Sequence, residues 1–292
     1  MNTPRVSVCL LAAGYGTRLY PLTKDHPKAL LPLGSGVTPP PASGPKGRLS
    51  SKGPPSADEV GGGVILDWIL DTVEAVPGLS KLVLVTNHKF FPQFEAWQRT
   101  HSRALELVDD GTSTPETRLG AIRDLMLGFA QVGAYDDLLV LGTDNVFTWS
   151  LADFVAFAKR KRPSATVALR QATSLQAASR CAVVELDGAA RLIRCVEKPA
   201  SPFSSTVALC VYYFSQACRG RFEEFVRIGG NVDAPGYFIE WLVKQEPVYG
   251  FMTDGEWFDI GSKESYQEAV QRWSRLAPLA RLQRTNPTGG SR

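Results

Sequence analysis

The sequence has little excess charge of either sign and few histidines. Its 292 residues include 32 Lys and Arg against 29 Asp and Glu, a formal net charge of +3. There is no basic stripe of the kind that follows a nucleic-acid backbone, so we expect no nucleic-acid partner. The three histidines, His26, His88 and His101, are too few and too scattered to favour a histidine-based zinc site.

Long apolar runs and paired cysteines are also missing. No window approaches the roughly 20 apolar residues that cross a bilayer, and the apolar stretch 6–11 is too short for a typical signal-peptide core. The five cysteines are an odd number without CxxC spacing, which is typical of buried thiols in a reducing compartment. The sequence therefore predicts a cytoplasmic protein that does not engage a membrane.

Strand-like and helix-like apolar patterns alternate in the first half of the chain. Strands are predicted at 6–11, 82–86, 105–108 and 138–141, and helices at 65–76, 90–98 and 119–129. This alternation favours βαβ units on a mainly parallel sheet with helices on both faces, a three-layer α/β sandwich. The second half is richer in strands, predicted at 166–169, 182–185, 192–196 and 207–214, with helices at 216–227, 236–245 and 264–277. We expect a single domain over residues 1–277 with an elaborated C-terminal half.

Two segments differ from the rest in composition. Residues 34–63 are rich in Pro, Gly and Ser and nearly free of bulky apolar side chains. Such a segment cannot bury enough surface to offset its ordering entropy, and we interpret it as a flexible insertion between two core elements. The tail, 278–292, is predicted to be disordered.

A glycine-rich turn follows the first buried strand directly, in the string Leu11-Ala12-Ala13-Gly14-Tyr15-Gly16-Thr17. Small residues there let backbone N–H groups approach phosphates. Arg18 adds a planar fork of donors, and Lys28 adds a point charge. A P-loop is excluded because Thr17-Arg18 follows Gly16, and a dinucleotide fingerprint is excluded because Leu19 stands where its third glycine would be.

The string from Leu10 to Leu19, with the later Pro27-Lys28-Ala29-Leu30-Leu31-Pro32, resembles the signature of sugar-1-phosphate nucleotidyltransferases. The resemblance extends over roughly residues 5–266 and implies a Rossmann-like fold. It implies an enzyme that couples a nucleoside triphosphate to a sugar 1-phosphate and releases pyrophosphate. The resemblance implies that Arg18 and Lys28 contact the triphosphate and the leaving pyrophosphate. The implied nucleotide-binding residues of the turn are Leu11, Ala12, Ala13, Gly14, Gly16 and Thr17.

Two aspartates complete the implied phosphate chemistry. Asp144 ends an apolar strand, where open parallel sheets bind ligands, and Mg²⁺ prefers one or two carboxylates plus phosphate oxygens. The resemblance assigns Asp144 and Asp259, the latter in Trp257-Phe258-Asp259-Ile260-Gly261, as ligands of Mg²⁺. Thr143 stands where the family usually has glycine, which brings a Cβ near the substrate phosphates. A turn or capping role is the alternative for each aspartate.

The sugar side is implied by the motif Glu197-Lys198-Pro199. In the family the matched Glu accepts hydrogen bonds from sugar hydroxyls, and the matched Lys meets the sugar phosphate, as suits a carboxylate and an ammonium. Lys198 is therefore also a candidate catalytic residue that orients the attacking phosphate. Tyr237 is a candidate to line the sugar pocket, although buried aromatics more commonly belong to a core.

The base side is implied by the polar loop 109–121. Asp110, Gly111 and Gly120 are the candidate nucleotide-binding residues there. The glutamine that many family members use for the base is not evident, so the identity of the base stays open.

Three other functions are alternatives to this interpretation. A phosphocholine-type cytidylyltransferase has a similar phosphate loop but favours an aromatic cage over Glu197. A catalytically silent relative that binds nucleotide sugars and regulates a partner is suggested by Thr143 and the insertion. A dinucleotide-dependent oxidoreductase lacks its third glycine. We expect an NTP and a sugar 1-phosphate as ligands, and a homo-oligomer, as in many family members.

Overall fold

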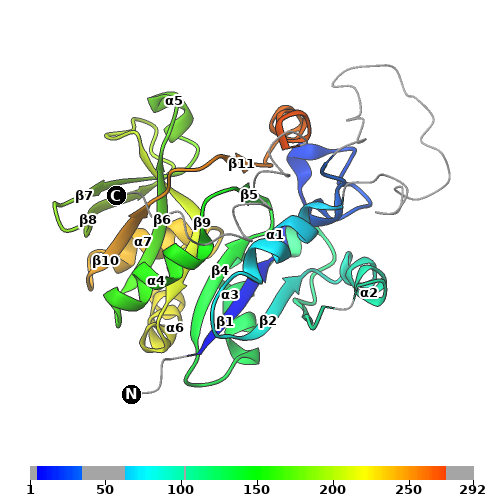
Figure 1. Ribbon diagram of the computed structural model, residues 1–292, viewed down its shortest axis with the longest axis horizontal. Helices are drawn as coiled ribbons and strands as arrows, with labels where there is room; N and C mark the ends of the chain where they lie inside the picture. The colour runs from blue at the N-terminus through cyan, green and yellow to red at the C-terminus, as the bar shows by residue number, and fades with distance from the viewer. Residues whose placement is uncertain (1–4, 35–62, 102, 274–292) are drawn as a thin grey trace. The chain divides into compact units, whose positions relative to one another are not determined.

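The computed structural model describes residues 5–34, 63–101 and 103–273. The described chain folds into two compact units, each assembled from three segments (Figure 1). Unit 1 comprises Met1–Gly14, Val76–Gly142 and Leu151–Asp254, and unit 2 comprises Tyr15–Ala75, Thr143–Ser150 and Gly255–Arg292. The predicted insertion lies outside the described residues except for its terminal glycines, as does the predicted tail. Leu33 N donates to Gly63 O at 2.9 Å, so the described residues on either side of this segment lie next to each other in unit 2.

The first half of unit 1 supplies the parallel part of its main sheet. Strand β1 (Val6–Leu11) lies between β2 (Leu79–Thr86) and β4 (Asp137–Gly142), parallel to both, and β3 (Glu106–Asp109) extends the sheet beyond β2. Val8 is opposite both Leu82 and Leu139. The central strands β1 and β4 are almost entirely buried and mostly apolar because both faces of a parallel sheet are covered. Their carboxyl ends therefore share one edge, where the predicted phosphate turn begins.

The second half of unit 1 adds antiparallel strands. Strand β9 (Thr206–Phe214) runs antiparallel between β4 and β6 (Ala165–Gln171), and β10 (Val248–Met252) is parallel to β6. A hairpin of β7 (Ala182–Leu186) and β8 (Leu192–Glu197) joins β9 through β7. The Asp187 carboxylate accepts Ala189 N at 2.8 Å and Arg191 N at 2.9 Å, an Asx-type turn that sets this hairpin and places Glu197 at its end.

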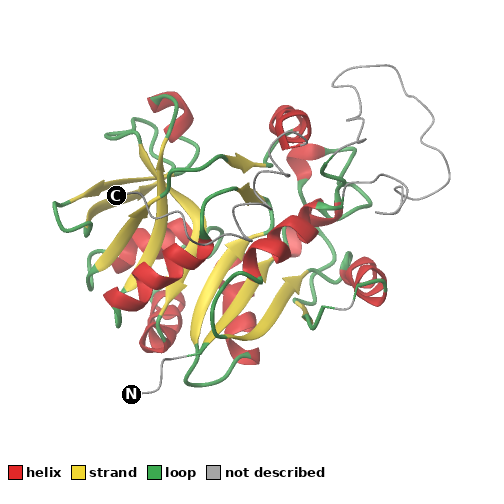
Figure 2. Cartoon of the chain, viewed as in Figure 1, coloured by secondary structure: helices red, strands yellow, loops and turns green. Residues whose placement is uncertain are grey.

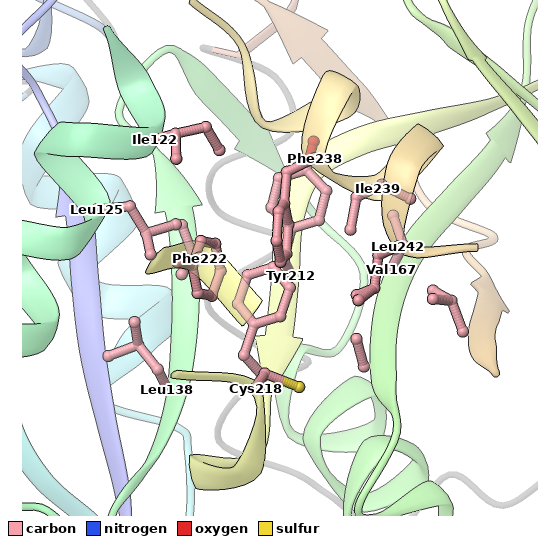
Figure 3. Close-up of a cluster of buried hydrophobic side chains, with 14 of the residues drawn as sticks. Ile122, Leu125, Leu138, Val167, Tyr212, Cys218, Phe222, Phe238, Ile239 and Leu242 are labelled. Carbon is pink, nitrogen blue, oxygen red and sulfur yellow. The ribbon is translucent and has the colours of Figure 1, made fainter. Parts of the chain in front are cut away.

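Helices cover both faces of this sheet (Figure 2). The helices α3 (Ala121–Gln131), α6 (Arg219–Arg227) and α7 (Pro235–Leu242) pack against one another. Their apolar side chains meet Leu138, Val167 and Tyr212 of the strands in one buried cluster (Figure 3). Within it Phe222 and Phe238 stack with ring centroids 4.0 Å apart. Helix α4 (Leu151–Lys161) packs on β6 and β10 from the other face (Figure 1).

Shorter helices lie between the strands of unit 1. Helix α2 (Phe91–Arg99) follows β2 and contacts β3, and α5 (Leu175–Ala178) precedes β7. Two 3₁₀ helices, η4 (Pro115–Thr117) and η5 (Gln216–Cys218), precede α3 and α6. In the described part of the chain, no helix combines the length and apolar character needed to cross a membrane.

Unit 2 is built around a two-stranded antiparallel ribbon. Strand β5 (Asn145–Phe147) pairs with β11 (Trp257–Asp259), and helix α1 (Ile65–Val73) contacts both β5 and the 3₁₀ helix η2 (Lys28–Leu30). A second 3₁₀ helix is η1 (Thr17–Leu19). A helix at 263–273 places Trp273 edge-on against Trp68 of α1, with ring centroids 5.5 Å apart. The buried indole of Trp68 donates to Leu33 O at 2.8 Å, as buried Trp N–H groups usually do.

The predicted fold class is confirmed: the main sheet is mixed, parallel in its first half, and elaborated by the second half of the chain. The predicted strands and helices are present with ends shifted by a few residues, and residues 274–277 of the predicted helix 264–277 lie outside the described residues. Helix α4 was missed, although Leu151, Phe154, Val155 and Ala158 are buried at helical spacing. Strands β5, β10 and β11 were also missed. The three-residue strands β5 and β11 are too short to show a period, so only their pairing defines them.

Candidate active site

Asp144 is held from both sides in unit 2. Lys28 Nζ donates to its Oδ2 at 2.9 Å, and Asn145 Nδ2 donates to its Oδ1 at 2.6 Å. Burial raises the pKa of Asp144, but the Lys28 ammonium and these hydrogen bonds outweigh burial and bring the pKa below its ordinary value. The Asp144 carboxyl is therefore ionised at neutral pH. Pro27 is extended and Lys28 opens η2, so a proline-defined turn presents this lysine.

Asp259 lies beside Asp144 through the pairing of β5 with β11. Asp259 is opposite Asn145 in the register, and Ile260 N donates to Asp144 O at 2.8 Å. Gly261 borders both Asp259 and Arg18, because a Cβ there would lie 3.2 Å from Asp259 Oδ2 and 3.4 Å from Arg18 Nη2. Four predicted residues from distant segments, Arg18, Lys28, Asp144 and Asp259, thus belong to one unit.

The glycine-rich turn is anchored at both ends. In unit 1, Ala12 N donates to Val85 O at 2.8 Å, and the Asn87 amide donates to Ala13 O at 2.9 Å. In unit 2, Gly16 has φ +62° and its carbonyl accepts Thr23 Oγ1 at 2.7 Å. A Cβ on Gly16 would lie 3.0 Å from Thr23 Oγ1, so both conformation and space favour glycine there.

The predicted residues Leu11, Gly14 and Thr17 have different settings in this turn. Leu11 ends β1, and Thr17 begins η1 directly before Arg18. A Cβ on Gly14 would have no described atom within 4 Å, which leaves room for a ligand close to the backbone. Asn87 is not among the residues predicted for this turn. Its polar side chain at a strand end is the signal that was available.

Glu197 and Lys198, the pair predicted to contact the sugar phosphate, lie in unit 1. The side chain of Glu197 is 5% exposed and that of Lys198 is 53% exposed, with 3.1 Å between Glu197 Oε1 and Lys198 Nζ. Burial raises the pKa of Glu197, and Lys198 only partly offsets it. Helix α7 begins against this carboxylate, because a Cβ on Gly236 would overlap Glu197 Oε2. Tyr237 is half-buried and packs against the main apolar cluster, so its sugar contact stays a prediction.

The base-side loop is tied to the ends of β2 and β3. Asp110 N donates to Thr86 O at 2.9 Å, and the buried Asp110 carboxylate accepts Thr112 N at 2.6 Å. Burial raises the pKa of Asp110. Gly111 has φ +77° and donates its N–H to Asp109 Oδ1 at 2.8 Å. The other oxygen of Asp109 contacts His88 Nδ1 at 2.6 Å, a contact that sequence reasoning missed.

The far end of that loop is tied to the segment before α7. Gly120 has φ +91°, and a Cβ there would lie 2.6 Å from Val232 O, so only glycine fits. Ile122 N donates to the same carbonyl at 3.0 Å. Arg118 and Asp233 form an exposed ion pair at 3.1 Å. The predicted base-side and sugar-side segments of unit 1 are therefore linked by direct contacts.

A buried carboxylate that sequence reasoning missed lies in α3. Asp124 is 7% exposed, and its Oδ1 has no hydrogen-bond partner among the described residues. Burial, followed by the charge of Asp110, raises the pKa of Asp124 to about 7. Because Asp124 sits among apolar residues at helical spacing, the sequence pattern shows only that this position faces inward.

In this chain a glycine-rich turn follows the first strand of an α/β sheet, and unit 2 holds two carboxylates bordered by Lys28 and Arg18. The chain belongs to the nucleotidyl transferase family, whose model matches residues 7–39 and 49–275.

Known proteins agree with this membership. A protein of Sulfolobus acidocaldarius named "Putative mannose-1-phosphate guanyltransferase" is 27% identical over 264 residues. The match covers 89% of this chain and 61% of that relative, so the chain spans less than two thirds of the relative's length.

Two solved structures share the fold. One is a "Putative Glucose-1-Phosphate Thymidylyltransferase" from Bacillus anthracis in complex with a sucrose, with a TM-score of 0.69 at 18% identity, covering 92% of this chain and 95% of that one. The other is a UDP-glucose pyrophosphorylase complexed with UDP-glucose, with a TM-score of 0.70 at 16% identity, covering 93% of this chain and 99% of that one.

Proposed function

We propose that this chain transfers a nucleotidyl group from a nucleoside triphosphate to a sugar 1-phosphate, forming a nucleoside diphosphate sugar and pyrophosphate. The observation that carries the proposal is the gathering of Arg18, Lys28, Asp144 and Asp259 in unit 2 from three separate segments. The proposed catalytic domain spans residues 1–277. Family membership supports the proposal, and the names of the relatives agree with it.

The donor chemistry at Asp144 and Asp259 suits Mg²⁺. This hard cation takes one or two carboxylates and completes its shell with water and substrate phosphates. The residues that the structure describes contain no cluster of three or more potential metal-binding side chains. Two protein carboxylates are enough for an Mg²⁺ ion whose other ligands are water and substrate phosphates. When bound, Mg²⁺ would neutralise charge on the reacting phosphates. Asp144 and Asp259 are the residues proposed to hold it.

The proposed reaction is an in-line displacement at the α-phosphorus. An oxygen of the sugar phosphate forms the new P–O bond, and the bond to the pyrophosphate oxygen breaks. No protein nucleophile is needed because the attacking oxygen is already anionic, so catalysis consists of positioning and charge neutralisation. Arg18 and Lys28 stabilise the leaving pyrophosphate. Glu197 accepts hydrogen bonds from sugar hydroxyls, and Lys198 orients the attacking phosphate.

The experiment is a substrate panel. ATP, GTP, CTP, UTP and dTTP are each paired with glucose, mannose and galactose 1-phosphates and with phosphocholine, and pyrophosphate release is measured with Mg²⁺ present. We expect release with at least one sugar 1-phosphate and identification of the matching nucleotide sugar by mass spectrometry. Release with phosphocholine alone would instead establish the cytidylyltransferase function. Tight binding of nucleotide sugars without turnover of any pair would establish the silent relative.

Two further expectations belong to this proposal. The five cysteines are thiols, three of them buried, as a reducing cytoplasm would keep them. A homo-oligomer is expected, and light scattering of the purified chain tests it.

A further inference from the structure

We propose that Asn145 and Trp257 are positioning residues that hold the Asp144 carboxylate in its ligand-binding orientation through a relay of hydrogen bonds. Trp257 Nε1 donates to Asn145 Oδ1 at 2.7 Å, and Asn145 Nδ2 donates to Asp144 Oδ1 at 2.6 Å. The role given to Asp144 rests on the proposed function. The relay itself is a set of contacts within unit 2.

The indole determines which way the Asn145 amide points. An amide has a donor end and an acceptor end, whereas the indole N–H of Trp257 is a donor only. Asn145 therefore turns its oxygen toward Trp257 and its NH₂ group toward Asp144. The reversed amide would set its oxygen against the carboxylate and its NH₂ group against the indole N–H. Asn145 is 4% exposed, so water cannot substitute for a lost partner without cost.

The relay acts on one oxygen of Asp144 while Lys28 acts on the other. Lys28 Nζ lies 2.9 Å from Oδ2, but an ammonium on a flexible stem is a point charge with rotatable donors and does not define the plane of a carboxylate. The planar Asn145 amide is the more rigid partner, since its own orientation is set by Trp257. An ionised carboxylate has about four acceptor positions, so the bonds from Lys28, Asn145 and the backbone leave a position for a metal ion.

The register of the ribbon explains why these residues act together. Asn145 is directly opposite Asp259, and Trp257 precedes Asp259 by two residues on the same strand. Residues two apart on a strand share a face, and a directly opposite residue shares it too. Trp257, Asn145 and Asp259 therefore project from one face of the ribbon. One register thus orients Asp144 through the relay and brings Asp259 beside it.

Metal affinity of the full chain tests the relay. Mn²⁺ replaces Mg²⁺ as the probe, and electron paramagnetic resonance measures its binding without substrates and again with a non-hydrolysable triphosphate. Trp257→Phe removes the indole N–H but keeps a ring, and Asn145→Ala removes the amide. We expect each variant to weaken Mn²⁺ binding by about 10–100-fold, as loss of a residue that orients a metal ligand usually does. We expect kcat to fall while KM for the sugar phosphate stays within about twofold.

A matched control exists in the same unit. Trp68→Phe also removes an indole-to-acceptor hydrogen bond, the 2.8 Å bond to Leu33 O, but neither of these two residues belongs to the relay. This variant is expected to lower the melting temperature and leave Mn²⁺ affinity unchanged. Asn145→Leu keeps nearly the same side-chain size and loses the donor without adding a charge, and it replaces Asn145→Ala if that variant does not fold.

A double-mutant cycle decides between a relay and two independent roles. In a relay, Trp257→Phe has no further effect once Asn145 is alanine, so the two losses of Mn²⁺ affinity do not add. Additive losses, or a Trp257→Phe affinity within twofold of the starting protein, would overturn the relay, as would Mn²⁺ binding that is indifferent to Asp144→Asn. Binding that depends on Asp144 and Trp257, but with no turnover of any substrate pair, would keep the relay and reject the proposed function.

Discussion

The Lys28–Asp144 pair of unit 2 and the Lys198–Glu197 pair of unit 1 have similar N···O distances, 2.9 Å and 3.1 Å, but opposite pKa shifts. Burial raises the pKa of both carboxylates. At Asp144 the lysine side chain is only 15% exposed and Asn145 adds a second donor, so the pKa is lowered overall. At Glu197 the lysine is 53% exposed, where solvent screens its charge. Burial and the charge of Glu240 therefore keep the pKa of Glu197 raised. Distance alone does not determine the charge of a carboxylate.

Asp124 is a third carboxylate for this comparison, and no cation contributes to the shift of its pKa. Its pKa is raised by burial and by Asp110, to about 7. The three carboxylates therefore form a series, from Asp144 with a shielded lysine, through Glu197 with a solvated one, to Asp124. These different pKa shifts separate carboxylates that stay ionised from carboxylates that titrate near neutral pH.

The largest effect is expected from breaking the unit 2 pair. Asp144→Asn removes a charge that Lys28 and Mg²⁺ both need, so kcat should fall by about 10²–10³-fold, measured as pyrophosphate release on the best substrate pair. Glu268→Gln is the control, since it removes an exposed carboxylate paired with Arg272 in the same unit. Activity near the starting level in Asp144→Asn would reject the assignment of Asp144.

The second-largest effect is expected in how the stability of the protein depends on pH through Asp124. The folded pKa of Asp124 is about 7 against an ordinary value of 3.8, so the folded chain holds an extra proton between those values. Stability is then greatest below the ordinary value and is lost as the pH rises through 7, by on the order of 2–4 kcal/mol. Asp124→Asn cannot ionise and should lack this loss, which makes it the more stable protein at pH 8. Urea unfolding of both proteins from pH 5 to 8 measures the difference, and parallel pH curves would show that Asp124 is ionised throughout.

A smaller effect is expected from disturbing the unit 1 pair. A Cβ on Gly236 would overlap Glu197 Oε2, so Gly236→Ala should displace the carboxylate at a cost of about 1–3 kcal/mol. We expect KM for the sugar 1-phosphate to rise about 10–100-fold, with KM for the NTP nearly unchanged. Gly188→Ala is the control, because its added Cβ would meet no described atom within 4 Å. Equal rises in both KM values would show that Glu197 is not specific to the sugar.

The smallest effect is expected at an ion pair that is exposed on both sides. The side chains of Arg118 and Asp233 are 55% and 52% exposed, so Asp233→Asn should change the free energy of unfolding by less than about 1 kcal/mol. Thermal melting at low and high salt measures the change. A loss of several kcal/mol would mean that shielding by protein is not what distinguishes strong from weak pairs here.

Most of the sheet and the motif-bearing residues were predictable from local sequence. Val6–Leu11 and Asp137–Gly142 are short apolar runs, and Pro27-Lys28 and Asp144-Asn145 stand at recognisable places. The partners of these residues were not predictable. Asn87 anchors Ala13, and Trp257 orients Asn145. These contacts join residues that are 74 and 112 positions apart in the sequence. No local pattern encodes a partner at such a separation.

The sequence by itself determined most of the segments that become strands and helices, because the period of apolar residues depends only on neighbours along the chain. It also determined which residue types were available for phosphate chemistry. Only the tertiary structure decided how these residues are charged and oriented. A carboxylate's pKa depends on the burial, donors and cations around it, and folding brings those groups from segments such as β5, β11 and η2.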